Sequence, residues 1–141
     1  MARITLGDDA QRMLLQAARA ARLNAYAPYS NFRVGAAVLD EQGQVHAGCN
    51  VENAAYPQGV CAEAAALSAM VLAGGRRATA LLVVGEGPAW VTPCGGCRQK
   101  LREFGGDDTP VLVADGRGVQ LRTTLGALLP HAFGPDHLEG V

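Results

Sequence analysis

The stretch TALLVVG, residues 79–85, is the most apolar part of a chain of 141 residues. A short apolar run that contains β-branched residues and ends at a glycine is typical of a strand buried on both faces of a sheet. Two segments of helical pattern flank it, one from about Cys61 to Gly74 and one over 94–104. This order predicts a central strand preceded and followed by a helix, as in α/β proteins.

The segments farther out extend this pattern. A helix is predicted over 10–26, where Asp8 and Asp9 are expected to cap it, and a short helix over 125–130. The remaining predicted strands cover 33–40, 45–50, 110–114 and 119–123. The turn between the last two strands is too short for a crossover, so these two strands must be antiparallel.

Two strand–helix–strand crossovers within one sheet predict a mixed five-stranded sheet with helices on both faces. We therefore expect a three-layer α/β/α fold. No linker or internal repeat interrupts the pattern, so residues 1–141 are expected to form a single domain.

The composition is 49% hydrophobic and 18% charged, which is typical of a globular protein. The net charge of -1 leaves no basic surface for a nucleic acid polymer, so no such partner is expected. No apolar run is long enough to span a bilayer, and the N-terminus lacks the apolar core of a secretory signal. We therefore expect a cytoplasmic protein that does not contact membranes. Thiols stay reduced in that compartment, and the four cysteines then suggest metal binding or catalysis.

Three of the four cysteines lie where the two flanking helices begin. Cys94 and Cys97 form a C-x-x-C pair, and Cys61 begins the preceding helix. Neighbouring strand–helix units bring their helix N-termini to the same edge of a sheet, so the three sulfurs are expected to converge. Three protein ligands and one open position are typical of a catalytic zinc ion. Cys49 could complete a four-sulfur structural site instead, although a buried strand-end thiol is the favoured interpretation.

Three thiolates around a divalent zinc ion leave a net charge of about -1 on the group. Two helix N-termini, each with about half a positive charge, are expected to offset this charge and to lower the pKa of the thiols. Arg98 follows Cys97 directly and is a candidate for adding a full positive charge nearby.

These residues resemble the zinc-dependent cytidine deaminases, the small homotetrameric type with three cysteine ligands. Five segments resemble motifs of that family in the same order and span nearly the whole chain: AYAPYSNFRVGAA at 25–37, GCNVENAAYP at 48–57, CAE at 61–63, PCGGCRQ at 93–99 and LLPHAFGPDHL at 128–138. The resemblance implies a cytidine deaminase-like fold with one zinc ion per subunit. It implies hydrolysis of cytidine and 2′-deoxycytidine to uridine and 2′-deoxyuridine, with release of ammonia, in pyrimidine salvage. It also implies a homotetramer in which neighbouring subunits complete each active site.

The resemblance also implies roles for single residues. Glu63 matches the catalytic residue that takes a proton from zinc-activated water and passes it to the base. Asn50 and Glu52 match residues that bind the ribose hydroxyls. The other substrate contacts implied are Phe32, Tyr56, the backbone of Ala62, and Phe133 from a neighbouring subunit.

Ala64 departs from the family pattern, in which arginine often follows C-A-E and offsets thiolate charge. We expect activity to be retained, with an altered pH optimum. Two alternatives remain open: a related zinc deaminase for another cytosine nucleoside, such as blasticidin S, and a non-enzymatic protein with a structural zinc ion. Glu63 distinguishes the second alternative, because a structural site has no use for this carboxylate.

Overall fold

The computed structural model describes residues 6–139. In chain order the elements are α1 (Asp8–Arg22), β1 (Gly35–Asp40), β2 (Val45–Cys49), the 3-10 helix η1 (Tyr56–Gln58), α2 (Ala62–Leu72), β3 (Ala78–Val84), α3 (Gly95–Phe104), β4 (Pro110–Asp115), β5 (Gly118–Thr124), α4 (Leu125–Leu128) and the 3-10 helix η2 (Pro135–Leu138). The predicted helices and strands are all present in the predicted order. No helix among the described residues is long and apolar enough to cross a lipid bilayer.

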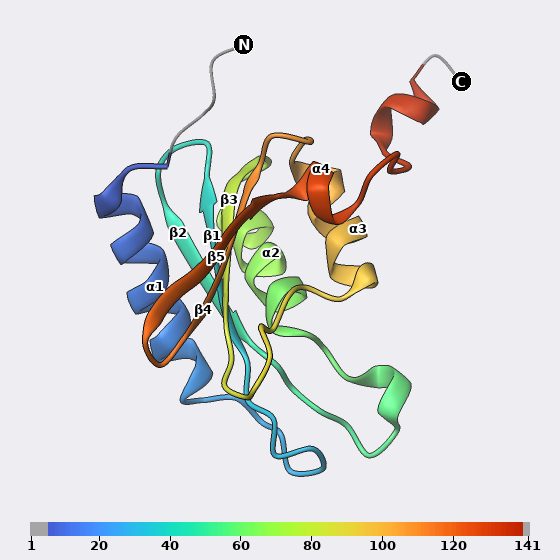
Figure 1. Cartoon of the computed structure of the whole chain (residues 1–141). Coiled ribbons are helices and arrows are strands. Elements are labelled where there is room, and N and C mark those ends of the chain that lie inside the picture. Colours follow the sequence, from blue (N-terminus) through green and yellow to red (C-terminus); the bar gives the residue numbers. More distant parts are fainter. Residues whose placement is uncertain (1–5, 140–141) are drawn as a thin grey trace.

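The five strands form one mixed sheet in the order β2-β1-β3-β4-β5. The central pair, β3 and β4, is parallel, and the other neighbouring pairs are antiparallel. The antiparallel pairing predicted for the last two strands is confirmed. Figure 1 shows α1 on one side of this sheet and α2 and α3 on the other, so the three-layer α/β/α prediction is also confirmed.

Helices cover both faces of the sheet, but the crossover helices are not divided between the two faces as predicted. Both crossover helices, α2 and α3, lie on the same face, and α1 covers the other (Figure 1). Both crossovers join parallel strands and move across the sheet in the same direction, from β2 to β3 and then to β4. Because such crossovers share one hand, successive ones in the same direction fall on the same face. The second face is covered only because α1 packs there.

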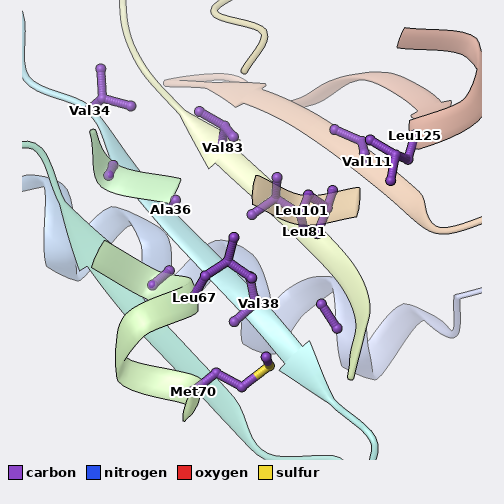
Figure 2. Packing of buried hydrophobic residues seen from close by; sticks show 13 residues of the cluster. Val34, Ala36, Val38, Leu67, Met70, Leu81, Val83, Leu101, Val111 and Leu125 are labelled. Carbon is purple, nitrogen blue, oxygen red and sulfur yellow. The ribbon is translucent and has the colours of Figure 1, made fainter. Parts of the chain in front are cut away.

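The alternation of side chains along the strands divides the core into two clusters. In β3, Leu81 and Val83 face α2 and α3, whereas Ala80 and Leu82 face Leu14 of α1. Figure 2 shows the first cluster, in which Leu67 and Met70 of α2 and Leu101 of α3 pack with the sheet residues. The alanine-rich sequence of α2 suits this layer, because small side chains let the helix lie close to the sheet.

Gly48 sets the distance between α2 and the sheet. A Cβ atom on Gly48 would lie 2.4 Å from the Ala66 nitrogen and 2.7 Å from the Ala62 carbonyl oxygen, both backbone atoms of α2. Any side chain at this position of β2 would therefore push α2 away. The absence of a side chain at Gly48 thus lets the first turn of α2, which carries Glu63, lie close to β2.

The start of α1 differs from the prediction that Asp8 and Asp9 cap it. The N-cap residue is Gly7, and no side chain caps the helix. Both aspartates lie in the first turn, where their negative charge favours the helix dipole. Asp9 also pairs with Arg12 one turn further on.

Candidate active site

Three cysteine sulfurs meet where α2 and α3 begin. Cys61 is the N-cap residue of α2, Cys94 is the N-cap residue of α3, and Cys97 lies in the first turn of α3. Their Sγ atoms all lie within 4.8 Å of one another. This spacing suits one zinc ion, because Zn–S bonds of about 2.3 Å place tetrahedrally arranged sulfurs about 3.8 Å apart. The predicted convergence of the three sulfurs is thus present in the fold.

The fourth cysteine lies apart from this group. Cys49 ends β2 and is half-buried, and among residues 6–139 the sulfur cluster contains Cys61, Cys94 and Cys97 alone. A four-sulfur structural site therefore lacks its fourth ligand. Three sulfurs leave one position of a tetrahedral zinc ion for a non-protein ligand, which is the arrangement of catalytic zinc sites.

The three thiols differ in their acidity. Burial raises the pKa of Cys97 and of Cys61, and neighbouring thiols and the Glu63 carboxylate add to the rise. The pKa of Cys94 is lowered, chiefly because the backbone N–H of Cys97 faces its sulfur. The lowered pKa of Cys94 agrees with the expected effect of a helix N-terminus, whereas burial is the largest influence on the pKa of Cys61 and of Cys97. A lowering of all three thiol pKa values by the helix N-termini in the zinc-bound site stays a prediction. A divalent cation reverses this balance, because it stabilises the thiolate forms.

Glu63 lies in the first turn of α2 beside the three thiols. Its side chain is buried, with the residue only 5% exposed, and burial raises the pKa of its carboxyl group. No lysine, arginine or histidine among the described residues pairs with it. A glutamate that only stabilises a helix dipole can do so from the surface. The burial of Glu63 next to the sulfurs therefore requires a further explanation.

Asn50, which follows β2, meets Phe32 near the end of the loop before β1. Asn50 Nδ2 donates to the Phe32 carbonyl oxygen at 2.8 Å, and Asn50 Oδ1 accepts from the Val34 N–H at 2.9 Å. Both ends of the amide thus hold the loop that presents Phe32. Phe32 is 42% exposed, whereas a phenylalanine that only packs in a core is buried.

Glu52 holds the same loop from the other side. Its Oε1 accepts from the backbone N–H groups of Tyr29 and Ser30 at 3.0 and 3.1 Å, and its Oε2 accepts from the Ser30 hydroxyl. These bonds, the Ser30 hydroxyl first, lower the pKa of Glu52 and keep it ionised at neutral pH. Asn50 and Glu52, which sequence reasoning placed on the ribose, therefore both shape the loop.

A cavity of about 270 Å³ lies beside Glu52 and is lined by Tyr29, Ser30 and Tyr56 as well. The rings of Tyr29 and Tyr56 lie 5.7 Å apart, centroid to centroid, and are tilted by 58°. The sequence analysis did not single out Tyr29 or Ser30. The available signal was the serine itself, whose hydroxyl accepts from the Phe32 N–H two residues on at 3.0 Å, a common turn contact.

Arg98 is directed into the loop before Cys94. Its guanidinium donates to the Pro93 oxygen at 2.6 Å, to the Leu128 oxygen at 2.8 Å and to the Thr92 hydroxyl at 3.2 Å. The side chain thereby fastens this loop to the end of α4. Its proposed effect on the charge of the zinc site stays a prediction.

Phe133 and Ala62 have contrasting surroundings. Phe133 lies after α4, in the C-terminal segment that projects from the body of the molecule (Figure 1), and is 57% exposed. Its ring stacks on His137, with the centroids 4.9 Å apart, and its carbonyl oxygen accepts from Gln99 Nε2 at 2.8 Å. Ala62 is buried in the first turn of α2, between Cys61 and Glu63.

Residues 8–113 match the family model described as the cytidine and deoxycytidylate deaminase zinc-binding region. The cytidine deaminase of Sporosarcina psychrophila is 43% identical over 131 residues, which cover 93% of this chain and 96% of the relative. That of Mycobacterium tuberculosis strain H37Rv is 47% identical over 126 residues, which cover 89% and 91%. A crystal structure of cytidine deaminase from Burkholderia pseudomallei has a TM-score of 0.80 and 46% identity, and covers 86% of this chain and 98% of that chain.

The matched region contains both helix starts that carry the converging thiols, and the relatives match this chain over nearly their whole length. Fold, donor set and sequence thus agree over the same residues. The chain belongs to the family of cytidine and deoxycytidylate deaminases and is an enzyme with a zinc cofactor.

Proposed function

We propose that the protein hydrolyses cytidine and 2′-deoxycytidine to uridine and 2′-deoxyuridine, with release of ammonia, and so serves pyrimidine salvage. The relatives are named cytidine deaminases, which supports the substrate class. The observation that carries the proposal is the buried Glu63 carboxyl beside the three sulfurs. Hydrolytic deamination requires a group at this place that both accepts and donates protons.

Cys61, Cys94 and Cys97 would hold the zinc ion. When bound there, zinc supplies Lewis acidity, which makes a water molecule more acidic and more nucleophilic at neutral pH. The ionised Glu63 carboxylate would accept a proton from this water. Burial raises the pKa of Glu63 and so favours a carboxyl that is able to hold the proton before passing it on.

Glu63 then gives this proton to N3 of the cytosine ring, which makes C4 electrophilic, and the water oxygen adds to C4. Next, Glu63 accepts the proton of the new C4 hydroxyl group and donates it to the amino group. The C4–N bond breaks, ammonia leaves, and the C4 carbonyl of uracil forms. One water molecule is consumed, and the carboxylate ends the cycle ionised, as it began.

The nucleoside would lie between this carboxyl and the loop that Asn50 and Glu52 hold. Phe32 would pack against the base, and the backbone of Ala62 would contact its polar edge. The cavity beside Glu52 and Tyr56 suits a ribose ring, and an ionised Glu52 is able to accept hydrogen bonds from ribose hydroxyls.

We further propose a homotetramer in the cytoplasm. The exposed Phe133 on a projecting segment suits a contact with the active site of a neighbouring subunit. Thiolate ligands must stay reduced, which favours a reducing compartment.

The test is the ultraviolet absorbance change of cytidine with the zinc-loaded protein and with Glu63→Gln. We expect turnover by the native chain and a kcat about 10² to 10⁴-fold lower in the variant, with unchanged zinc content. Glu41→Gln, in the exposed turn after β1, is the matched control and should retain full activity. No cytidine turnover by the zinc-loaded native chain would contradict the proposed reaction, and an active Glu63→Gln variant would contradict the role of this carboxyl.

A further inference from the structure

Phe133 lies on a C-terminal arm, residues 130–138, that projects from the body of the molecule (Figure 1). Phe133 itself is exposed, yet the next residue, Gly134, is buried. A buried residue within an exposed arm marks the place where the arm rests on the remainder of the chain. The contacts of Gly134 therefore set the direction in which Phe133 leaves the subunit.

Gly134 is covered by Arg102 of α3. A Cβ atom on Gly134 would lie 2.5 Å from Arg102 Cζ and 2.7 Å from each of its Nη1 and Nη2 atoms. The central carbon is the nearest of the three, so the guanidinium turns its flat face toward the glycine. The φ of Gly134 is -153°, an extended value that any residue adopts, so glycine is required here for space alone.

The same guanidinium holds the arm at a second point. Arg102 Nη2 donates to Asp136 Oδ1 at 2.8 Å, and the side chains are 19% and 58% exposed, respectively. A pair that is this exposed on one side contributes little by itself. Its effect on the arm therefore depends on the contact that the same guanidinium makes with Gly134.

A second side chain of α3 holds the arm next to Phe133. Gln99 lies three residues before Arg102, on the same side of the helix, and its Nε2 donates to the Phe133 carbonyl oxygen at 2.8 Å. The two side chains thus hold the peptide that joins Phe133 to Gly134. Because the first turn of α3 carries Cys97, one helix relates the arm to the sulfurs.

His137 relates the Phe133 ring to this anchored backbone. Its Nδ1 atom accepts from the Gly134 N–H at 3.1 Å, and its ring stacks on the Phe133 ring with the centroids 4.9 Å apart. The direction of the Phe133 ring therefore depends on the same glycine that Arg102 covers.

We propose that Arg102 is a positioning residue that, by covering Gly134 and pairing with Asp136, fixes the direction of Phe133 and so fits its ring to the nucleoside in a neighbouring subunit. This inference rests on the proposed function, in which Phe133 contacts the substrate of a neighbour. Arg102 acts through Phe133, so its loss should weaken substrate binding more than it slows the chemical step.

The experiment compares the native chain with Arg102→Ala and Gly134→Ala, all loaded with zinc. The first change removes the guanidinium and the second displaces it, so each should raise KM for cytidine about 3- to 10-fold and leave kcat within about 2-fold of native. Zinc content and sedimentation should stay native. Amide hydrogen exchange of the arm, measured on the same samples, should be faster in both variants because the arm is held less firmly.

Two further variants separate this contact from general damage. Adding Gly134→Ala to Arg102→Ala should raise KM no further, because the methyl group added at position 134 then has no guanidinium to displace. Arg12→Ala is the matched control. It removes an arginine that also pairs with an aspartate, Asp9, but on α1 at the other face of the sheet. It should keep native KM and native exchange in the arm.

A native KM in Arg102→Ala would overturn the inference and leave the proposed reaction intact. Multiplied effects in the double variant would also overturn it, and so would dissociation of Arg102→Ala into smaller species, which would show that the arm holds subunits together. A native chain without cytidine turnover would overturn the proposed function. Hydrogen exchange alone would then decide whether Arg102 fixes the arm, and equal exchange in the native chain and in Arg102→Ala would show that it does not.

Discussion

Asn50 and Phe32 are joined by a hydrogen bond of 2.8 Å from Asn50 Nδ2 to the Phe32 carbonyl oxygen. The same amide accepts from the Val34 N–H, so one side chain at the end of β2 fixes both sides of residue 33 in the loop before β1. The motif that resembles a nucleoside-binding segment is thereby coupled to the aromatic ring expected to contact the base. A substitution at Asn50 should alter both the stability of the loop and the binding of substrate.

Asn50→Asp keeps the shape and the acceptor but removes the donor to Phe32. We expect the free energy of unfolding to fall by about 1–3 kcal/mol, because the Phe32 carbonyl oxygen loses its hydrogen bond and faces a carboxylate oxygen instead. KM for cytidine should rise more than kcat falls, since the zinc ligands and Glu63 are untouched. Chemical denaturation and steady-state kinetics measure the two effects.

Asn53→Asp is the matched control in the same segment. Asn53 Oδ1 accepts from the Ala55 N–H at 2.9 Å, and an aspartate retains this acceptor. Stability and KM should therefore stay close to native values. Equal effects at positions 50 and 53 would show that added charge, rather than the lost bond to Phe32, is responsible.

Gly48→Ala should disturb the active site by displacing the first turn of α2, which carries Glu63. The added methyl group would lie 2.4 and 2.7 Å from backbone atoms of α2. Because these are backbone atoms, rotation of a side chain cannot relieve the contact. We expect a loss of at least about 1–3 kcal/mol in the free energy of unfolding, and weaker zinc retention, because the first turn of α2 must shift. Gly106→Ala is the control, since a Cβ atom there meets nothing within 4 Å, and its effect should stay within about 0.5 kcal/mol.

The part of the site that sequence reasoning predicted depends on local pattern and topology. Cys61 and Cys94 each begin a helix, and strand–helix units in one sheet bring such helix starts to one edge, so their convergence follows without knowledge of packing. The sequence does not predict that both crossover helices lie on the same face of the sheet. Their common face depends on the strand order, which the positions of the strands along the chain do not fix.

Side-chain directions were beyond the same reasoning because they depend on distant partners. Arg98 follows Cys97 in the sequence, but it donates to Leu128, 30 residues further on, and to the loop before Cys94. Similarly, the sequence does not show that Glu52 accepts a hydrogen bond from Ser30, 22 residues earlier. Adjacency in sequence predicted which residues surround the sulfurs, but not which partners each charged group takes.

Replacement of Cys49 and replacement of Cys97 should have different effects on zinc binding. Cys97→Ala removes one of three converging sulfurs and should abolish stoichiometric zinc binding, together with cytidine turnover. Cys49→Ala should retain one zinc ion per subunit, because its sulfur lies outside the cluster. Metal analysis of the purified variants measures both. A loss of zinc from Cys49→Ala would revive the four-sulfur structural site.

Asp40 should make the stability of the fold depend on pH in the acidic range. Its Oδ2 lies 2.8 Å from His46 Nε2, and its Oδ1 accepts from the N–H groups of Gln42 and Gln44. These contacts, the one with His46 first, lower the pKa of Asp40 in the folded state. The folded protein then binds this proton more weakly than the unfolded chain, so the stabilisation is complete above the unfolded pKa of about 3.9 and is lost as pH falls through the lower folded value.

Thermal unfolding of the native chain and Asp40→Asn at a series of pH values tests this expectation. The variant should melt at a lower temperature at pH 7, and the difference should shrink as pH falls below about 4. Asp108→Asn, which alters an exposed side chain with no hydrogen-bond partner in the described part of the chain, should melt as the native protein does at each pH. A difference that stays constant down to the lowest pH would rule out a contribution from the Asp40 charge.

Phe133 should act in a neighbouring subunit rather than in its own. Its ring is exposed on a projecting segment, so Phe133→Ala should fold and bind zinc normally, yet it should lose cytidine turnover. Glu63→Gln should be inactive for a separate reason. Mixing the two variants under conditions of subunit exchange should restore about a quarter of native activity, because that share of sites pairs an intact Glu63 with an intact Phe133 from a neighbour. A mixture as inactive as its components, after exchange is verified with labelled subunits, would place Phe133 within the site of its own chain.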